Sequence, residues 1–386
     1  MNNFEFYNPV KIIFGKDQLV KLADNIPENK KVLMIYGGGS ILKNGVYDAI
    51  KEVLNSYTVL EFNGIEPNPR YETAMKAVEL IKSEKIDFLL AVGGGSVIDA
   101  TKFIAAAALF NEGDPWDILA KRNPVNMALP FGVVLTLPAT GSEMNSGSVM
   151  TREATHEKFA FSSPLTFPVF SFLLPDAAAT LPKRQVANGV VDAFMHTMEQ
   201  YMTFPANAPL QDRFAESILQ TLIEEGPKAY ANPADYEAMS NLMWSATMAL
   251  NGLIGCGVPQ DWAVHMMGHE LTASFGIDHA RTLAIIAPSH YKFNFESKKE
   301  KLAQYGVRVW GIATGTLDEK AHAAIEKTEA FFHSLGVDTK LSQYTDNYKG
   351  TAQNISKRFN DRGWVGLGEN RNLKPSDVEK IVEMSY

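Results

Sequence analysis

Short apolar runs alternate with helical patterns through the first half of this chain, and this alternation most limits the fold. The runs KVLMIY (31–36), TVLEF (58–62), DFLLAV (87–92) and FGVVLTL (131–137) are rich in strand-forming residues. Helical apolar spacing separates them, most plainly in YETAMKAVELIKSEK (71–85). Because the runs lack strict polar–apolar alternation, we expect both faces of each strand to be buried. Such strands, alternating with helices, predict a parallel sheet covered on both sides.

The strand signals stop near residue 180, and the rest of the chain has helical periodicity. The change falls within the proline-flanked segment LLPDAAATLPKRQ (173–185). A chain of 386 residues is also longer than a single ordinary core accommodates. We therefore predict an α/β, Rossmann-like parallel-sheet domain over residues 1–180 and an all-α domain over residues 181–386.

The charge balance and the single cysteine argue against several classes of protein. A net charge of −8 without a long basic run disfavours a nucleic-acid partner or a membrane-surface protein. No apolar stretch approaches the roughly 20 residues of a membrane-spanning helix, and MNNFEFYNPVKIIFG lacks the pattern of a signal peptide. Cys256 has no second cysteine to pair with, which is typical of a reducing compartment. We expect a cytoplasmic location.

The sequence GGGS follows a predicted strand twice, at residues 37–40 and 93–96. Glycines let backbone N–H groups approach an anion, and a following helix N-terminus adds favourable partial charge. Neither copy has the GxGxxG spacing of the common dinucleotide fingerprint, so each is either a phosphate-binding loop or a tight turn. In the second copy, Ser96 is placed to cap the next helix with Asp99 three residues on, so this pair also fits a capping box.

The first copy has no acid at the end of its strand, where the chain reads Tyr36 and then GGGS. A carboxylate at this position binds the ribose 2′-hydroxyl in NAD sites, and it repels a 2′-phosphate. The neutral, hydroxyl-bearing loop therefore favours NADP(H), provided that a dinucleotide binds there.

Acidic and imidazole side chains occur in helical pairs in the second half. Asp192 and His196 are four residues apart in VVDAFMH, and His265 and His269 are four apart in HMMGH. Each pair shares one helix face, and His279 follows in GIDHA, where a preceding glycine indicates a turn. A carboxylate with three imidazoles can hold Fe²⁺ or Zn²⁺. Each histidine alone also fits a core or surface position, so the spacing leaves both interpretations open.

The HMMGH segment differs from the HExxH motif of zinc peptidases. Methionine replaces the glutamate that acts as general base, and Glu270 lies on a different helix face from His269. A metallopeptidase is therefore disfavoured. The nearby aromatic residues Trp244, Trp262 and Phe275 have the spacing of core residues, and we do not include them in the site.

Four segments spread along the chain carry a more specific signal. They are GGGSVID (93–99), TLPATGSE (136–143), GVVDAFMHTMEQY (189–201) and HMMGHELTASFGIDHAR (265–281). Together they resemble the iron-activated (group III) alcohol dehydrogenase family. The segments YGGGS and NGIEPNPRYET are further similar to its subgroup of NADPH-dependent broad-substrate aldehyde reductases and butanol dehydrogenases. The resemblance implies the dehydroquinate synthase-like fold, with a Rossmann-like domain before a helical metal-binding domain.

The resemblance also implies roles for individual residues. The positions that match the family's ligands for one divalent metal, Fe²⁺ or Zn²⁺, are Asp192, His196, His265 and His279. His269 matches a histidine near the nicotinamide that is not a ligand, and its implied role is either proton relay or pocket wall. Asp99 matches a ribose contact. The positions that match the NADP(H) site are Gly37, Gly38, Gly39, Ser40, Asn68, Gly94, Gly95, Ser96, Asp99, Thr136, Thr140, Asn145 and Lys158.

The activity implied by the resemblance is reduction of short-chain aldehydes such as butanal to primary alcohols. The metal would polarise the carbonyl, and the cofactor would supply the hydride. The implied partners are a small aldehyde or alcohol and a second copy of the chain. Two alternatives stay open. One is a lyase or cyclase on the related dehydroquinate synthase scaffold, which needs a basic cluster that the helical half does not obviously contain. The other is a metal-dependent hydrolase that uses no nucleotide.

Overall fold

The computed structural model describes residues 1–386, which divide into two compact units. The α/β unit comprises residues 7–182 and 232–251, and the helical unit comprises residues 1–6, 183–231 and 252–386. The boundary predicted at residue 180 lies beside the end of the first long segment. The division differs from the sequence-based one at 1–6 and at 232–251, which cluster with the opposite unit.

Helix α7 (Tyr236–Ala249) explains the larger of these two differences. It packs on the 3₁₀ turns η4 (Ser142–Met144) and η7 (Pro175–Ala178) of the α/β unit. The Thr247 hydroxyl donates a hydrogen bond to the buried Glu143 carboxylate. Helical periodicity predicts that this segment is a helix, but it carries no information on which core the helix covers.

Six parallel strands form the sheet of the α/β unit, in the spatial order β1-β8-β5-β4-β2-β3. The strands are β1 (Lys11–Phe14), β2 (Lys31–Tyr36), β3 (Thr58–Phe62), β4 (Phe88–Gly93), β5 (Phe131–Leu135) and β8 (Phe170–Leu173). The four strands predicted from apolar runs are confirmed, with ends that agree within two residues. The central strands β4 and β5 are buried at every position, as expected for strands covered on both faces.

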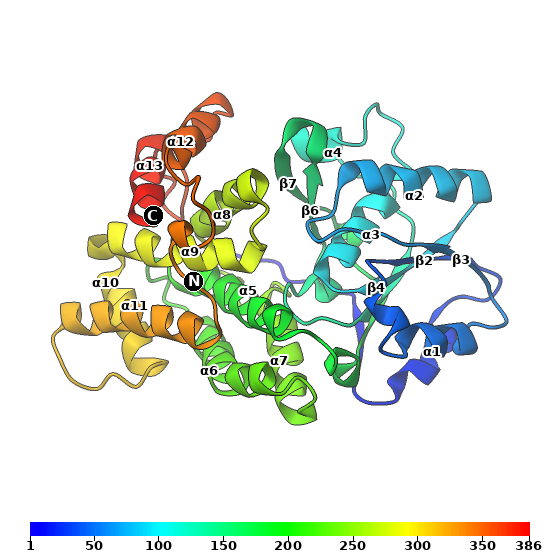
Figure 1. Cartoon of the computed structure of the whole chain (residues 1–386), viewed down its shortest axis with the longest axis horizontal. Helices are drawn as coiled ribbons and strands as arrows, with labels where there is room; N and C mark the ends of the chain where they lie inside the picture. The colour runs from blue at the N-terminus through cyan, green and yellow to red at the C-terminus, as the bar shows by residue number, and fades with distance from the viewer. The chain divides into compact units, whose positions relative to one another are not determined.

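Helices cover both faces of this sheet. Alternate residues of β2, beginning with Val32, belong to the core on the face of α1 (Val46–Val53). The helices α2 (Tyr71–Glu84) and α3 (Gly95–Ala107) lie on the other face, as Figure 1 shows. Helix α3 is buried at almost every position, so it forms the inner layer beneath α2 and an antiparallel hairpin.

A two-stranded antiparallel hairpin, β6 (Gly147–Arg152) and β7 (Glu157–Ser162), packs on α3 and was not anticipated. Its first strand is anchored beside the loop before α2, because the backbone N–H of Thr151 donates to Pro69 O at 2.8 Å. A short helix, α4 (Asp117–Ala120), contacts the second strand. Strand pairing places Lys158 opposite Thr151, so the hairpin fixes the position of this lysine.

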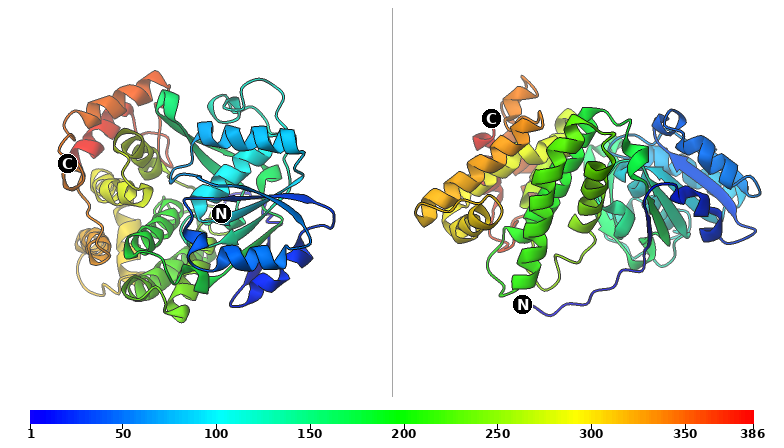
Figure 2. Two further views of the ribbon diagram at one scale, coloured as in Figure 1. Left: turned by 45° about the vertical axis from the view of Figure 1, so that its right-hand side comes forward. Right: turned by 90° about the horizontal axis from the view of Figure 1, so that it is seen from below.

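The helical unit is built around two buried helices, α5 and α9, which pack on each other. Helix α8 packs on α9, and the last helix of the chain packs on α9 as well, which Figure 2 shows as red beside yellow. None of its helices, nor any in the other unit, has both the length and the apolar character needed to cross a membrane. The helices are α5 (Lys183–Tyr201), α6 (Pro209–Ala231), α8 (Ala263–Phe275), α9 (His279–Phe293), α10 (Phe295–Arg308), α11 (Leu317–Ser334), α12 (Thr351–Asp361) and α13 (Pro375–Met384).

Two local predictions from the motifs are wrong. Ser96 is not a helix cap: α3 already begins at Gly95, and Gly94 occupies the N-cap position. The Asp99 carboxylate makes tertiary hydrogen bonds instead of closing a capping box. His279 is the first residue of α9 and not part of a turn, because the turn ends at Asp278.

Candidate functional site

Three of the predicted metal ligands meet in the helical unit. One potential ligand atom from each of Asp192, His265 and His279 lies within 4.8 Å of the other two. Asp192 comes from the middle of α5, His265 from the first turn of α8, and His279 from the start of α9. Residues separated by up to 87 positions in the sequence are thus brought together by the packing of three helices.

His196 lies beside this group, one helical turn after Asp192. Its Nε2 atom is 3.7 Å from Asp192 Oδ1, and its ring stacks on that of His265 with centroids 4.9 Å apart. The Trp262 ring stands edge-on to His265 at 5.1 Å, so this aromatic residue borders the cluster although its spacing indicated a core position. Helical spacing could not predict this position, because Trp262 lies just before α8 and has a left-handed backbone conformation.

The chemistry of these donors fits a divalent metal. Asp192 is 4% exposed, and its Oδ1 atom is buried without a hydrogen bond, which is unfavourable for a carboxylate unless a cation compensates it. Nε2 of His279 is 3.9 Å from the same oxygen. One carboxylate and neighbouring imidazoles form a mixed oxygen and nitrogen donor set suited to Fe²⁺ or Zn²⁺.

Glu199 orients His265 and was missed in the sequence. Its Oε1 atom accepts a hydrogen bond from the His265 backbone N–H at 2.9 Å, and it lies 2.9 Å from Nδ1 of the same ring. Because Nδ1 is engaged by Glu199, Nε2 of His265 is the nitrogen available to a metal. Carboxylates commonly orient metal-binding histidines in this way. The position of Glu199, seven residues after Asp192 on the same helix, was the available signal.

We expect Glu199→Gln to weaken metal binding by about 10–100-fold, the usual effect of altering a residue that orients a ligand. The amide oxygen can still accept from the His265 backbone N–H and from Nδ1–H, but an amide cannot carry the charge that strengthens the bond to the imidazole. Competition with a chromogenic chelator measures the metal dissociation constant. Glu224→Gln, at an exposed position on α6, is the matched control. Equal affinities in the two variants would contradict the orienting role.

The glycine of HMMGH, Gly268, lies within α8 where this helix contacts α9. A Cβ atom at this position would lie 2.9 Å from Thr282 Oγ1 and 3.0 Å from Leu283 Cδ2. The missing side chain therefore allows α8 to approach α9 closely. Because His265 and His279 lie on these two helices, the same close approach brings the two imidazoles together.

We expect Gly268→Ala to lower stability by about 1–3 kcal/mol through overpacking, and to weaken metal binding because the two helices must separate. Thermal unfolding and the metal dissociation constant check these effects together. Ser274→Ala, on an exposed part of the same helix, controls for helix propensity. An unchanged melting temperature and metal affinity in Gly268→Ala would show that the contact is not tight.

His269 lies one turn after His265 on α8 and is half-buried. Its ring centroid is 4.9 Å from that of His279 and 6.4 Å from that of His265. It is not part of the group of three whose ligand atoms converge. Its position next to the cluster agrees with a residue that borders the site.

The two GGGS loops lie close together at the carboxyl edge of the parallel sheet. They follow β2 and β4, which are neighbouring strands in register. A Cβ atom at Gly37 would lie 3.6 Å from Val97 Cγ2 in the first turn of α3. Ligands of open α/β sheets bind at this edge. The structure therefore places both loops where one extended nucleotide could contact them.

Thr140 packs directly on the start of α3. A Cβ atom at Gly95 would lie 2.4 Å from its Oγ1 and Cγ2 atoms, so only glycine fits there. Thr136 adjoins the same loop, since its N–H donates to Gly93 O at 3.0 Å. These two threonines thus lie beside the second GGGS loop, as the prediction of a cofactor site requires.

Asn68, in the loop before α2, contacts Lys158 on strand β7 of the hairpin. The Lys158 ammonium donates to Asn68 Oδ1 at 2.8 Å, and Asn68 has a left-handed backbone with φ of 57°. Lys158 is 8% exposed. The pair is therefore fixed in position, and it supplies a positive charge in the same unit as the two loops.

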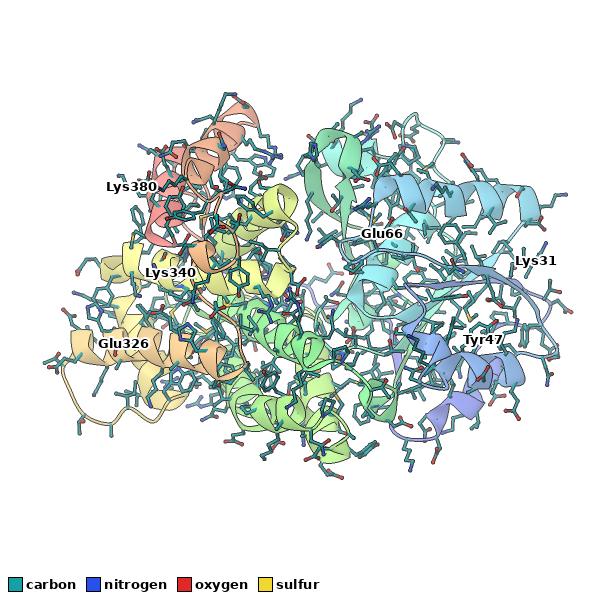
Figure 3. The ribbon with its side chains drawn as sticks, in the orientation of Figure 1. Lys31, Tyr47, Glu66, Glu326, Lys340 and Lys380 are labelled. Carbon is teal, nitrogen blue, oxygen red and sulfur yellow. The ribbon has the colours of Figure 1, made fainter.

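Glu61 lies near the end of β3, the strand that pairs with β2 and so neighbours the first GGGS loop. Nearby hydroxyl groups and a lysine compensate its charge. Its carboxylate accepts hydrogen bonds from the hydroxyl groups of Tyr47, labelled on α1 in Figure 3, and Tyr36. Lys51 lies 3.1 Å away. Burial opposes ionisation, yet these hydrogen bonds hold the pKa of Glu61 below its ordinary value. The segment 37–40 itself contains no acid.

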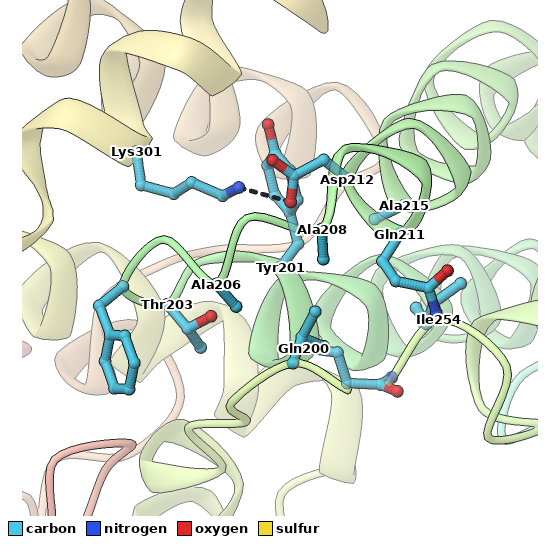
Figure 4. A pocket seen from close by; sticks show the side chains of 12 residues that line it. Gln200, Tyr201, Thr203, Ala206, Ala208, Gln211, Asp212, Ala215, Ile254 and Lys301 are labelled. Carbon is cyan, nitrogen blue, oxygen red and sulfur yellow. Dashed lines mark ion pairs between the residues drawn. The ribbon is translucent and has the colours of Figure 1, made fainter. Parts of the chain in front are cut away.

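A small pocket lies at the carboxyl end of α5, one turn beyond His196 (Figure 4). Lys301 and Asp212 form an ion pair of 2.7 Å across it, and Lys301 lies over the Tyr201 ring. None of the predicted metal ligands lines this pocket. Its walls are therefore separate from the candidate metal centre.

Comparison with known proteins identifies the family of this chain. The profile of the iron-containing alcohol dehydrogenase family matches residues 9–175, and the profile of the C-terminal part of the Fe-containing alcohol dehydrogenase family matches residues 186–386. The chain belongs to the iron-containing alcohol dehydrogenase family. This membership favours neither the lyase nor the hydrolase alternative.

Individual relatives cover the chain from end to end. It is 53% identical over 385 residues to the NADPH-dependent aldehyde reductase YqhD of Escherichia coli, covering 99% of both chains. It is 43% identical over 390 residues to the probable NADH-dependent butanol dehydrogenase 1 of Bacillus subtilis, covering 100% of both. The crystal structure of E. coli YqhD superposes with a TM-score of 0.98 at 52% identity, covering 100% of this chain and 99% of that one.

Proposed function

We propose that this enzyme reduces short-chain aldehydes such as butanal to primary alcohols with NADPH and a divalent metal. The convergence of Asp192, His265 and His279 beside His196, in a chain of this family, is the observation that carries the proposal. The printed activity of the E. coli relative, aldehyde reduction with NADPH, supports the same reaction.

We assign the metal to Asp192, His196, His265 and His279, as predicted from the sequence. The buried Oδ1 of Asp192, which lacks a hydrogen bond, supports this assignment. When bound, the metal supplies Lewis acidity toward the substrate oxygen, and the nicotinamide supplies the hydride. Both Fe²⁺ and Zn²⁺ suit the donor set. Glu199 holds the His265 ring in place through Nδ1.

His269 is the residue we expect either to supply a proton to the product or to form a wall of the substrate pocket. His269 borders the ligand cluster, with its ring 4.9 Å from that of His279. An imidazole at this position can donate the proton that the product oxygen requires. As a pocket wall, it would instead exclude water and limit the position of the aldehyde. The two roles differ in the pH dependence of kcat for His269 variants.

We assign NADP(H) to the α/β unit, with its 2′-phosphate at the first GGGS loop. The relatives include both NADPH- and NADH-dependent enzymes, so the preference depends on the loop itself. Gly38 and Ser40 are exposed, and the segment has no carboxylate to repel a phosphate. We assign the pyrophosphate to Gly94, Gly95 and Ser96, because a helix N-terminus such as the start of α3 favours an anion.

We further propose a cytoplasmic homodimer. The single cysteine supports a reducing compartment. The homodimer stays a prediction from the family resemblance, and sedimentation equilibrium measures it.

Product analysis tests the proposed reaction. Metal-loaded enzyme, NADPH and butanal should give one butan-1-ol for each NADPH consumed. A hydrolase would act without nucleotide, and a lyase would regenerate it. Turnover of a substrate without net NADPH oxidation would replace the proposed function with one of these two.

A further inference from the structure

Lys102 is a fully buried charged residue whose role the sequence did not reveal. It lies on α3, three residues after Asp99, and is 0% exposed. Its ammonium donates to Ser142 Oγ at 2.8 Å, to Asn145 Oδ1 at 2.9 Å and to Gly147 O at 2.7 Å. An ammonium group has three hydrogens, so these bonds use its full donor capacity.

All three acceptors belong to one segment, residues 142–147, which leads from η4 into β6. The same segment is tied to α3 a second time. Ser142 Oγ donates to Asp99 Oδ1 at 2.6 Å, and Val149 N donates to Asp99 Oδ2 at 2.9 Å. Asp99 and Lys102, about one turn apart on α3, therefore hold this segment and the start of β6.

Asn145 has no remaining hydrogen-bond capacity. Its Oδ1 accepts from Lys102 and from Gly147 N at 2.9 Å, and its Nδ2 donates to Gly141 O at 2.9 Å and Leu250 O at 3.2 Å. A side-chain amide offers two donors and two acceptor positions. The predicted cofactor contact of Asn145 would require it to give up one of these bonds, so its amide is better suited to shaping the loop.

Electrostatic compensation explains why a lysine is tolerated at this depth. Glu143, in the same segment, is 1% exposed, and burial raises the pKa of its carboxyl and of Asp99. Burial lowers the pKa of Lys102 to about 8, while attraction to Asp99 and Glu143 opposes the change. All three partners of Nζ are acceptors, so these hydrogen bonds require the ammonium form. It balances carboxylates that would otherwise be buried without a counter-charge.

We propose that Lys102 is a positioning residue of the dinucleotide site, which holds residues 142–147 so that Thr140 stays against Gly95 at the start of α3. The proposal rests on the proposed function, because it assumes that a dinucleotide binds at this loop. Thr140 Oγ1 accepts from Ser142 N at 3.2 Å, and this bond links the anchored segment to the loop. A displacement of the segment therefore shifts the wall that faces the pyrophosphate.

Lys102→Met tests the proposal, because it retains the length and removes the charge and the three donors. The dissociation constant of NADPH, measured by fluorescence titration, should rise by about 10–100-fold, since small displacements of a binding surface have effects of this size. KM for NADPH should rise more than kcat falls. Bound metal should match that of the wild type, because its ligands lie in the helical unit. Lys76→Met, at an exposed position on α2, is the matched control.

A second variant keeps the test decisive if Lys102→Met does not fold. Ser142→Ala removes one acceptor of Lys102 and one donor to Asp99 without changing a charge, and it should weaken NADPH binding several-fold. A lower melting temperature with an unchanged NADPH dissociation constant, in Lys102→Met or in a folded Ser142→Ala, would leave Lys102 a purely structural residue and overturn the proposal. If the wild type binds neither NADPH nor NADH, the proposed function fails first, and the inference fails with it.

Discussion

Replacing His265 with alanine should remove bound metal and nearly all aldehyde reduction. His265 is 6% exposed, its ring lies beside those of His196 and His279, and alanine offers no ligand atom in its place. Loss of a direct ligand should weaken metal binding by more than the roughly 100-fold seen when an orienting residue is lost. A metal supplies several kcal/mol to charge stabilisation, so kcat/KM should fall by at least about 1,000-fold. Elemental analysis after dialysis, together with steady-state kinetics, measures both effects.

The control for this variant is His322→Ala. His322 is exposed on α11 in the same unit, where it stacks on Phe295. It should keep its metal and its activity, and both variants should bind NADPH with wild-type affinity. A metal-loaded and active His265→Ala enzyme would refute the ligand assignment.

Introducing an acid into the first GGGS loop should reverse the preference between cofactors. A Cβ atom at Gly38 would meet no atom within 4 Å, and the backbone there is not left-handed, so Gly38→Asp fits without strain. The aspartate would repel the 2′-phosphate of NADPH, and juxtaposed like charges cost several kcal/mol. We expect kcat/KM for NADPH to fall by about 100-fold, and kcat/KM for NADH to change little. Steady-state kinetics with both cofactors measure the ratio.

Gly38→Asn isolates the effect of charge, because asparagine has nearly the same shape as aspartate. It should keep most of the preference for NADPH. Equal losses in the two variants would indicate a steric cause. An unchanged ratio in Gly38→Asp, or a preference of the wild type for NADH, would place the 2′-position away from this loop.

The strands and the fold class could be predicted because burial on two faces leaves a strong local pattern. KVLMIY corresponds to β2 residue by residue, since every position but the first is buried. The hairpin β6–β7 left no such pattern, because several of its residues are half-exposed and its register depends on contacts with α3 and the loop at Pro69. Helix α7 was recognised as a helix, but its assignment to the α/β unit depends on partners such as Glu143, about a hundred residues away.

The candidate ligands could be predicted because i,i+4 pairs and the family motifs both point to them. The residues that support them could not, because their roles depend on tertiary contacts. Glu199 lies within a recognised motif and Lys102 three residues after one, yet only the fold shows that Glu199 contacts His265 and that Lys102 reaches residues 142–147. Ser96 was misjudged for a similar reason, because the helix starts two residues earlier than a cap at Ser96 implies, at Gly95, where Thr140 packs.

The central claim is tested most directly by the rate at which butanal oxidises NADPH through a cycle of metal removal and return. The loss of near-ultraviolet absorbance of NADPH would be followed before chelation, after chelation, and after adding Fe²⁺ or Zn²⁺, with NADH in parallel. We predict rapid oxidation of NADPH that disappears on chelation, returns with metal and is slower with NADH. Undiminished oxidation by enzyme shown to be metal-free, or none by metal-loaded enzyme with several aldehydes, would contradict the account.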